Sequence, residues 1–165
     1  MDDPLVTDDA RGLVADLTVR RQTVATAESL TGGLLAATIA GVPGASLVLR
    51  GGLVTYTEFT KIVLAGVARQ VLADVGPVAA PTARALAVGA HERCGATWGV
   101  GVTGVAGPEP HGGHPVGTVF VGLTGPADTE VMQLTLPGSR WDIRLAAVHH
   151  AISRLRELVE QQEQR

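Results

Sequence analysis

The stretch ATAESLTGGLLAA, residues 25–37, places a serine in a polar, glycine-containing segment directly before an apolar run. We expect Ser29 to lie in a tight turn between a strand and a helix that begins near Thr31. The backbone N–H groups of Thr31, Gly32 and Gly33 would then point past Ser29, where they could hold a phosphate or a developing oxyanion. The simpler interpretation is that Ser29 or Thr31 only caps the helix. Ser29 is therefore a candidate nucleophile, and the alternative is that it has only a structural role as a helix cap.

A serine nucleophile needs a base, because its protonated hydroxyl reacts slowly. Lys61 is the only lysine of the chain, and it follows Tyr56 by five residues in TYTEFTK, after an expected strand. Lysine acts as a base near neutral pH only if burial or a neighbouring positive charge lowers its pKa to roughly 7–8. Tyr56 could relay a proton or hydrogen-bond the nucleophile. The alternative is a solvated lysine and a tyrosine that packs only through its ring.

The five histidines are poorly placed for the role of base. His91 falls within an expected helix, and two more fall within the last helix. His111 and His114 lie in a loop rich in proline and glycine, and only Glu109 is near enough in sequence to complete a metal site with them, which is a weak ligand set. We therefore expect no metal, and Lys61 remains the candidate base.

Two other patterns could bind a ligand. GVGVTG, residues 99–104, matches GxGxxG, but its glycines lie inside an expected strand and do not open a helix, so we reject a dinucleotide site. Thr103 and Gly104 instead end a strand whose small residues permit the close approach of a ligand, unless they only let a helix pack on the sheet. Arg140 and Arg144 share one face of a helix, which suits a phosphate, although such a pair is often solvated surface.

The elements that must position these residues alternate between helix and strand. Three successive strands without a helix between them predict antiparallel pairing within a mixed sheet. Ser139 and Asp142 predict a capping box at the start of the last helix. The pattern indicates one three-layer α/β/α domain over residues 1–165, with a core over about 12–155. We expect helices over 8–21, 31–40, 58–65, 68–74, 82–95 and from 140, and strands over 22–27, 51–57, 97–104, 116–124 and 130–136.

The composition indicates a compact globular protein, with 45% hydrophobic and 18% charged residues. A net charge of -3 without a Lys/Arg stripe, and only five aromatic residues, argue against a nucleic-acid partner. The acidic start MDDPLVTDDARG differs from a signal peptide, and no apolar run approaches the roughly 18 residues that span a bilayer. We expect a cytoplasmic protein without a membrane partner. Cys94 is the only cysteine, which excludes an intrachain disulfide.

The motifs, taken in order, resemble those of the CinA C-terminal domain family, which includes stand-alone nicotinamide-nucleotide amidases of the PncC type. The resemblance covers about residues 12–155, and several separated motifs in register are far more specific than any one of them. The matching elements are TAESLTGGLLAA, VPGAS, GLVTYTEFTK, VTGVAGP, PVGTV, and GSR with Arg144 four residues after its arginine.

This resemblance implies a hydrolase that acts on a linear amide. The implied reaction is deamidation of nicotinamide mononucleotide to nicotinate mononucleotide and ammonia, without a cofactor. Ser29 would be the nucleophile and Lys61 its base, with Tyr56 assisting. The nucleotide or the tetrahedral intermediate would be bound by Thr31, Gly32, Gly33, Thr103, Gly104, Arg140 and Arg144.

The sequence departs from the family pattern in three places. Leu30 stands where the family usually has cysteine, Glu58 replaces an amide in the family's TYSNEAK element, and the loop before PVGT reads EPHGGH, with His114 before Pro115. The departures spare the proposed chemistry but alter the rim that would select the substrate. A non-catalytic nucleotide-binding module is therefore the alternative function.

Two further expectations concern assembly. The longer family members carry an additional amino-terminal domain, for which 165 residues leave no room, so we expect none of that domain's activities. The apolar segment SLVLRGGLV could cover part of a subunit interface, and a symmetric homo-oligomer is the default for such an enzyme.

Overall fold

A computed structural model describes residues 2–162 and contains a five-stranded sheet in the order β2-β1-β3-β4-β5. The first three strands in this order run parallel, whereas β4 pairs antiparallel with both β3 and β5. The sheet is therefore mixed, and the expected antiparallel pairing of the last three strands is confirmed. The strands are β1 (Val24–Glu28), β2 (Leu49–Val54), β3 (Trp98–Gly104), β4 (Thr118–Thr124) and β5 (Thr129–Thr135).

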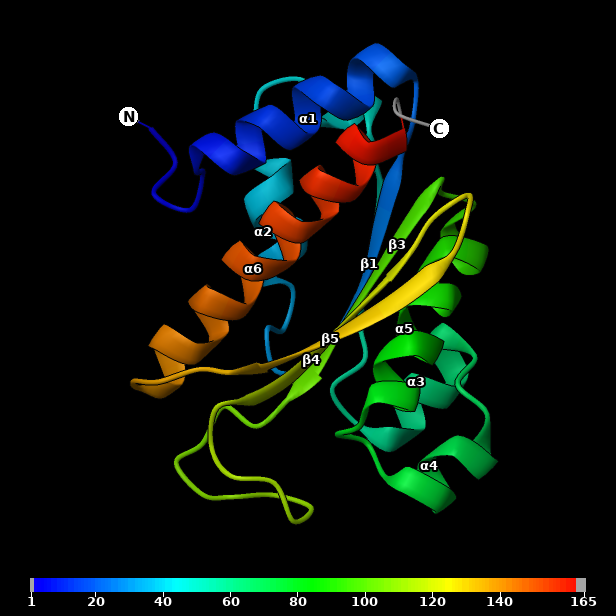
Figure 1. Ribbon diagram of the computed structural model, residues 1–165, viewed down its shortest axis with the longest axis vertical. Coiled ribbons are helices and arrows are strands. Elements are labelled where there is room, and N and C mark those ends of the chain that lie inside the picture. The colour runs from blue at the N-terminus through cyan, green and yellow to red at the C-terminus, as the bar shows by residue number, and fades with distance from the viewer. Residues whose placement is uncertain (1, 163–165) are drawn as a thin grey trace.

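Helices cover both faces of this sheet, as Figure 1 shows. One face carries α1 (Asp8–Arg20), α2 (Leu34–Ala40) and α6 (Arg140–Gln161). The other carries α3 (Glu58–Ala65), α4 (Arg69–Val75) and α5 (Ala80–Cys94). A short 3-10 turn, η1 (Ala45–Leu47), follows α2. The expected three-layer α/β/α architecture is confirmed.

Local chemistry explains where the elements begin. The Ser139 hydroxyl accepts the Asp142 N–H while the Asp142 carboxylate accepts the Ser139 N–H, so the predicted capping box is confirmed. The expected start of α2 near Thr31 is wrong, because the helix begins at Leu34. Gly32 and Gly33 have φ values of 57° and 100°, a left-handed backbone that a right-handed helix excludes.

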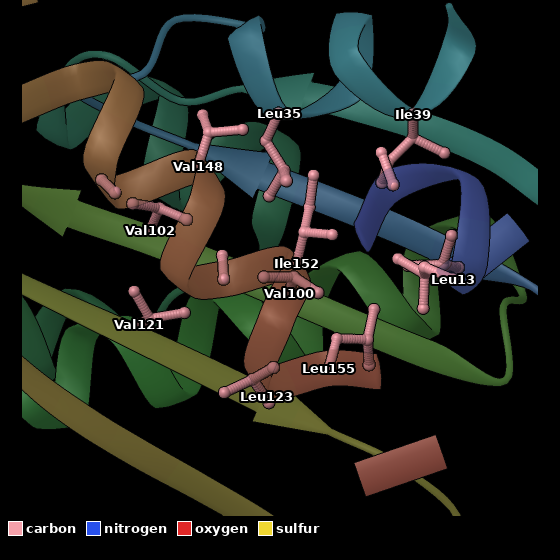
Figure 2. Close-up of a cluster of buried hydrophobic side chains, with 14 of the residues drawn as sticks. Leu13, Leu35, Ile39, Val100, Val102, Val121, Leu123, Val148, Ile152 and Leu155 are labelled. Carbon is pink, nitrogen blue, oxygen red and sulfur yellow. The ribbon is translucent and has the colours of Figure 1, made fainter. Parts of the chain in front are cut away.

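The larger core lies between the sheet and the layer of α1, α2 and α6 (Figure 2). Its side chains come from all three helices and from the facing sides of β3 and β4, and they are almost completely buried. Each fully buried side chain of this kind stabilises the fold by roughly 1.5–3 kcal/mol. The labelled members are Leu13, Leu35, Ile39, Val100, Val102, Val121, Leu123, Val148, Ile152 and Leu155.

Glycines let α5 approach the opposite face of the sheet. A Cβ on Gly101 would lie 2.5 Å from the Ala83 carbonyl oxygen, and one on Gly99 would lie 2.1 Å from the Ala87 carbonyl oxygen. Both carbonyls belong to α5, so no side chain fits between the helix and β3 at these positions. For Gly99 and Gly101, the small residues of GVGVTG therefore serve helix packing.

This contact predicts a large effect of Gly101→Val on folding. We expect the free energy of unfolding to fall by about 3 kcal/mol, because the added atoms force α5 away from β3. Gly44→Ala is the control, since its Cβ would meet nothing within 4 Å and only its φ of 90° is strained. Urea unfolding followed by circular dichroism measures both changes, and equal destabilisation of the two variants would contradict the packing account.

Candidate active site

A cavity of about 580 Å³ lies at the carboxyl ends of the parallel strands β1 and β3, beside the start of α3 and of α6. Open α/β sheets commonly bind ligands at this edge. Six of the ten residues with a catalytic or binding role predicted from the sequence line the cavity: Ser29, Tyr56, Lys61, Thr103, Gly104 and Arg140. The fold therefore collects at one edge residues that are up to 111 positions apart in the chain.

Ser29 and Lys61 meet at the floor of this cavity. Ser29 follows the last residue of β1, and Lys61 lies on the first turn of α3. The Lys61 Nζ atom is 2.9 Å from the Ser29 Oγ atom, and it also donates a hydrogen bond of 2.7 Å to the carbonyl oxygen of Thr55. Lys61 is 1% exposed and Ser29 is 9% exposed, so both groups are largely buried although they border the cavity. A hydroxyl and an amine at this distance can exchange a proton directly.

Burial changes the acidity of Lys61. Loss of hydration lowers the pKa of its ammonium from 10.5 to about 8, while the nearby Glu58 carboxylate acts in the opposite direction. About one Lys61 amine in ten is then free at pH 7, and about nine in ten are free at pH 9. The lysine therefore has the acidity that a base near neutral pH requires.

This pKa predicts the pH dependence of any reaction in which Lys61 is the base. We expect kcat/KM to rise about tenfold between pH 7 and pH 9, because only the free amine can accept the serine proton and kcat/KM reports the pKa of the free enzyme. Initial rates measured over this range at substrate concentrations well below KM give this rise. A rate that is flat over the same range would exclude the free amine as the group that limits turnover.

The turn that follows Ser29 differs from the expected anion site. The Glu28 carboxylate accepts the N–H groups of Leu35 and Ala36 at 2.8 and 3.1 Å, so the start of α2 already holds a carboxylate from the chain itself. The Gly32 N–H donates to the Ser29 carbonyl oxygen at 3.0 Å and does not point freely past the hydroxyl. The start of α2 therefore already has a carboxylate partner, and a ligand role for the N–H groups of Thr31 and Gly33 remains a prediction.

Arg144 holds the turn after Ser29 through two backbone carbonyl groups. Its Nε donates to the Leu30 carbonyl oxygen at 2.9 Å, and its Nη2 donates to that of Thr31 at 3.2 Å. Its guanidinium also lies 5.8 Å from the centre of the Trp141 ring. The structure therefore does not bring the two arginines of α6 together as a clamp. A part in substrate binding remains a prediction for four residues that do not line the cavity: Thr31, Gly32, Gly33 and Arg144.

Arg140 and Tyr56 meet across the mouth of the cavity. Arg140 Nη2 donates to the Tyr56 hydroxyl at 2.7 Å, and Nη1 donates to the Gly107 carbonyl oxygen. These bonds join the start of α6 to the segments that follow β2 and β3. The Tyr56 side chain is 53% exposed, and its hydroxyl partner in this structure is Arg140. Arg140 supplies the cavity with a fixed positive charge.

Thr103 and the loop after β3 form the other wall. The Thr103 hydroxyl donates to the Pro77 carbonyl oxygen at 2.6 Å, which fixes the end of β3 to the segment before α5. His111 and Glu109 also line the cavity. The backbones of His111 and His114 pair with each other, and the His114 ring packs edge-on against Phe120. Within residues 2–162, no three His, Cys, Asp or Glu side chains are grouped as metal ligands.

Sequence reasoning missed the groups that act through their backbone. The Thr55 and Gly107 carbonyls accept hydrogen bonds from Lys61 and Arg140, yet a backbone acceptor leaves no mark in the residue type. In the sequence, Glu58 stood out only as a departure from the family pattern. In the structure it lines the cavity, and its charge raises the pKa of Lys61 against the larger lowering by burial. The position of Glu58 three residues before Lys61 on a helix could have predicted that proximity.

The model of the CinA C-terminal domain family matches residues 7–159. The chain belongs to this family. A CinA-like protein of Frankia casuarinae is 46% identical over 153 residues, which are 92% of this chain and 35% of the relative. A putative competence-damage inducible protein of Streptococcus pneumoniae is 41% identical over 146 residues, 88% of this chain and 35% of that protein. The chain thus spans about a third of the length of these curated relatives.

Solved structures of the family share the fold. The competence/damage inducible protein of Agrobacterium tumefaciens superposes with a TM-score of 0.91 at 34% identity, over 98% of this chain and 99% of that one. A CinA superfamily protein of Escherichia coli gives a TM-score of 0.89 at 28% identity, over 92% and 88% of the two chains. Among residues 2–162, no helix combines the length and apolarity needed to cross a bilayer.

Proposed function

We propose that this CinA C-terminal domain protein is a serine amidohydrolase that converts nicotinamide mononucleotide to nicotinate mononucleotide and ammonia. The observation that carries the proposal is the buried contact of 2.9 Å between Ser29 Oγ and Lys61 Nζ at the floor of a cavity. Its support from the sequence is the ordered set of family motifs. We also propose that the reaction takes place in the cytoplasm.

The reaction begins when the neutral Lys61 amine accepts the proton of the Ser29 hydroxyl. Ser29 Oγ then forms a bond to the carboxamide carbon of the substrate, and the carbonyl π electrons move to the oxygen. As the tetrahedral intermediate collapses, the C–N bond breaks and the Lys61 ammonium returns its proton to the nitrogen, which leaves as ammonia. A water molecule, deprotonated by Lys61, attacks the resulting ester and releases the acid and the free serine. No metal is needed for these steps.

The cavity suits a small charged nucleotide. Its volume of about 580 Å³ falls within the range of 300–1,000 Å³ that is usual for small-molecule sites. Arg140 borders the cavity and offers the planar, multidentate donor that phosphate groups prefer. Glu58 and Glu109 lie on the same lining, so the cavity carries charges of both signs. A mononucleotide with a phosphate and a cationic pyridinium ring is complementary to such a lining.

The test is to incubate the purified protein with nicotinamide mononucleotide and to measure ammonia enzymatically and nicotinate mononucleotide by chromatography. We expect the two products in equal amounts. Nicotinamide riboside, which lacks the phosphate, serves as the matched substrate and should give a higher KM if Arg140 binds the phosphate. Tight nucleotide binding in a calorimeter without ammonia over long incubation would support the alternative of a non-catalytic nucleotide-binding module.

A further inference from the structure

Thr55 connects the candidate base to the residue that precedes the nucleophile. It follows β2 directly and is completely buried. Its backbone N–H and its hydroxyl both donate to the carbonyl oxygen of Glu28, at 2.7 and 3.2 Å. Its own carbonyl oxygen accepts the Lys61 Nζ at 2.7 Å. A short chain of hydrogen bonds therefore leads from the end of β1 through Thr55 to the amine.

The Lys61 amine needs such an acceptor for geometric reasons. A neutral amine has one lone pair and two N–H bonds, and only the lone pair can accept a proton from Ser29. The lysine stem has four carbons, and its terminal group rotates freely unless it is held. The N–H bond to the Thr55 carbonyl fixes that rotation, which allows the lone pair to face the Ser29 Oγ atom 2.9 Å away.

We propose that Thr55 is a positioning residue: its hydroxyl, bonded to Glu28, fixes the carbonyl group that orients the Lys61 amine toward Ser29. This inference rests on the proposed function, in which Lys61 is the base. Thr55 is not among the residues that line the cavity, so it acts through Lys61 and not through the substrate.

The other end of this chain of hydrogen bonds is rigid. Glu28 is 1% exposed, and its carboxylate is held by the N–H groups of Leu35 and Ala36 on α2. Ser29 is the next residue, and its own N–H donates to the Val102 carbonyl oxygen of β3 at 2.8 Å. Thr55 therefore connects the Lys61 amine to the same end of β1 that holds Ser29. A loss of the Thr55 hydroxyl loosens one partner of the pair relative to the other.

The test compares two substitutions at this position. Thr55→Val keeps the shape of the side chain and removes the hydroxyl, whereas Thr55→Ser keeps the hydroxyl. We expect Thr55→Val to lower kcat for ammonia release about tenfold and to leave KM within about twofold, because misplacement of a reacting group slows the chemical step. Thr55→Ser should restore kcat to within about threefold of the wild type.

Thr38→Val is the matched control. Thr38 is also completely buried, and its hydroxyl also donates to a backbone carbonyl, that of Leu34, but it lies within α2 and away from the cavity. We expect the control to keep the wild-type kcat. If Thr55→Val does not fold, Thr55→Ala removes the same hydroxyl without adding a methyl group to the site, and the same tenfold loss is expected of it.

A second readout separates this inference from the identity of the substrate. A small fluorophosphonate phosphonylates Ser29 Oγ with loss of fluoride and does not depend on a substrate-specific pocket, so it reports the reactivity of Ser29 directly. Its labelling rate should fall about tenfold in Thr55→Val. Slower labelling in a protein that releases no ammonia from the nucleotide would uphold the role of Thr55 and reject the proposed substrate. Three results would overturn the role of Thr55. They are a wild-type kcat and labelling rate in Thr55→Val, a raised KM with unchanged kcat in that variant, and equal losses of kcat in Thr55→Val and Thr55→Ser. A wild-type chain that is neither labelled nor active would overturn it as well.

Discussion

Ser29→Ala is expected to abolish ammonia release from nicotinamide mononucleotide, with a loss in kcat of about 10⁴-fold or more. The substitution removes the oxygen that forms the bond to the carboxamide carbon and leaves the Lys61 amine with the Thr55 carbonyl as its hydrogen-bond partner among residues 2–162. The nucleotide should still bind, because Arg140 and the walls of the cavity are untouched. A steady-state ammonia assay and a calorimetric titration of the same preparation measure the two effects.

Ser46→Ala supplies the matched control for this experiment. Ser46 lies on η1, is exposed and is absent from the lining of the cavity. Its replacement should leave both kcat and nucleotide binding unchanged. If Ser29→Ala kept ammonia release within tenfold of the wild type, the hydroxyl would not be the nucleophile, and water activated directly by Lys61 would become the better description.

The parts of the fold that are fixed by local chemistry could be predicted from the sequence. The helix expected over 58–65 occupies those residues in the structure, because Thr57 and Thr60 cap its start and Gly66 ends it in a left-handed conformation. The mixed sheet followed from the absence of a helix between the last three strands. Periodicity and capping are short-range effects, so one sequence is enough to reveal them.

The approach of residues distant in sequence was only partly predictable. The ends of two strands marked Ser29 and Thr103 separately as candidate site residues, and the single lysine marked Lys61, but no pattern in the sequence placed the three side by side. The spacing of Arg140 and Arg144 predicted a shared helix face, yet their guanidinium groups contact different segments. Spacing gives the face of a helix, but the acceptors that neighbouring elements offer decide where a long side chain ends.

Glu28 shows why the start of α2 was misplaced. A carboxylate directly before the serine suggested a polar site, but its side chain accepts the N–H groups of Leu35 and Ala36, at a helix start that lies further along the chain than we expected. The start of α2 depends on the left-handed backbone at Gly32 and Gly33, which places the first helical residue at Leu34, three residues after the expected start at Thr31. Two adjacent glycines permit this path but do not require it.

Lys61→Met is expected to lower kcat by about 10³-fold or more, because methionine fills a similar volume and cannot accept the serine proton. Nucleotide binding should change little. Val63→Met, on the exposed side of the same helix, is the control and should keep full activity. Activity of Lys61→Met within tenfold of the wild type would show that another group takes the proton from Ser29.

The same substitution should also change how stability depends on pH. The pKa of Lys61 is about 8 in the folded chain and 10.5 when the lysine is solvated, so the unfolded chain binds more protons between these values and wild-type stability rises with pH across that window. The rise amounts to about 3 kcal/mol.

Lys61→Met lacks this rise, because methionine does not titrate. The variant also leaves the Thr55 carbonyl without its partner, which lowers the free energy of unfolding by about 1–3 kcal/mol at every pH. We therefore expect the stability of the variant relative to the wild type to be highest below pH 8 and to decline by about 3 kcal/mol toward pH 10.5. Urea unfolding at pH 7 and at pH 10.5 measures this difference, and a constant difference would mean that the lysine titrates alike in the folded and unfolded chains, which is incompatible with a buried base.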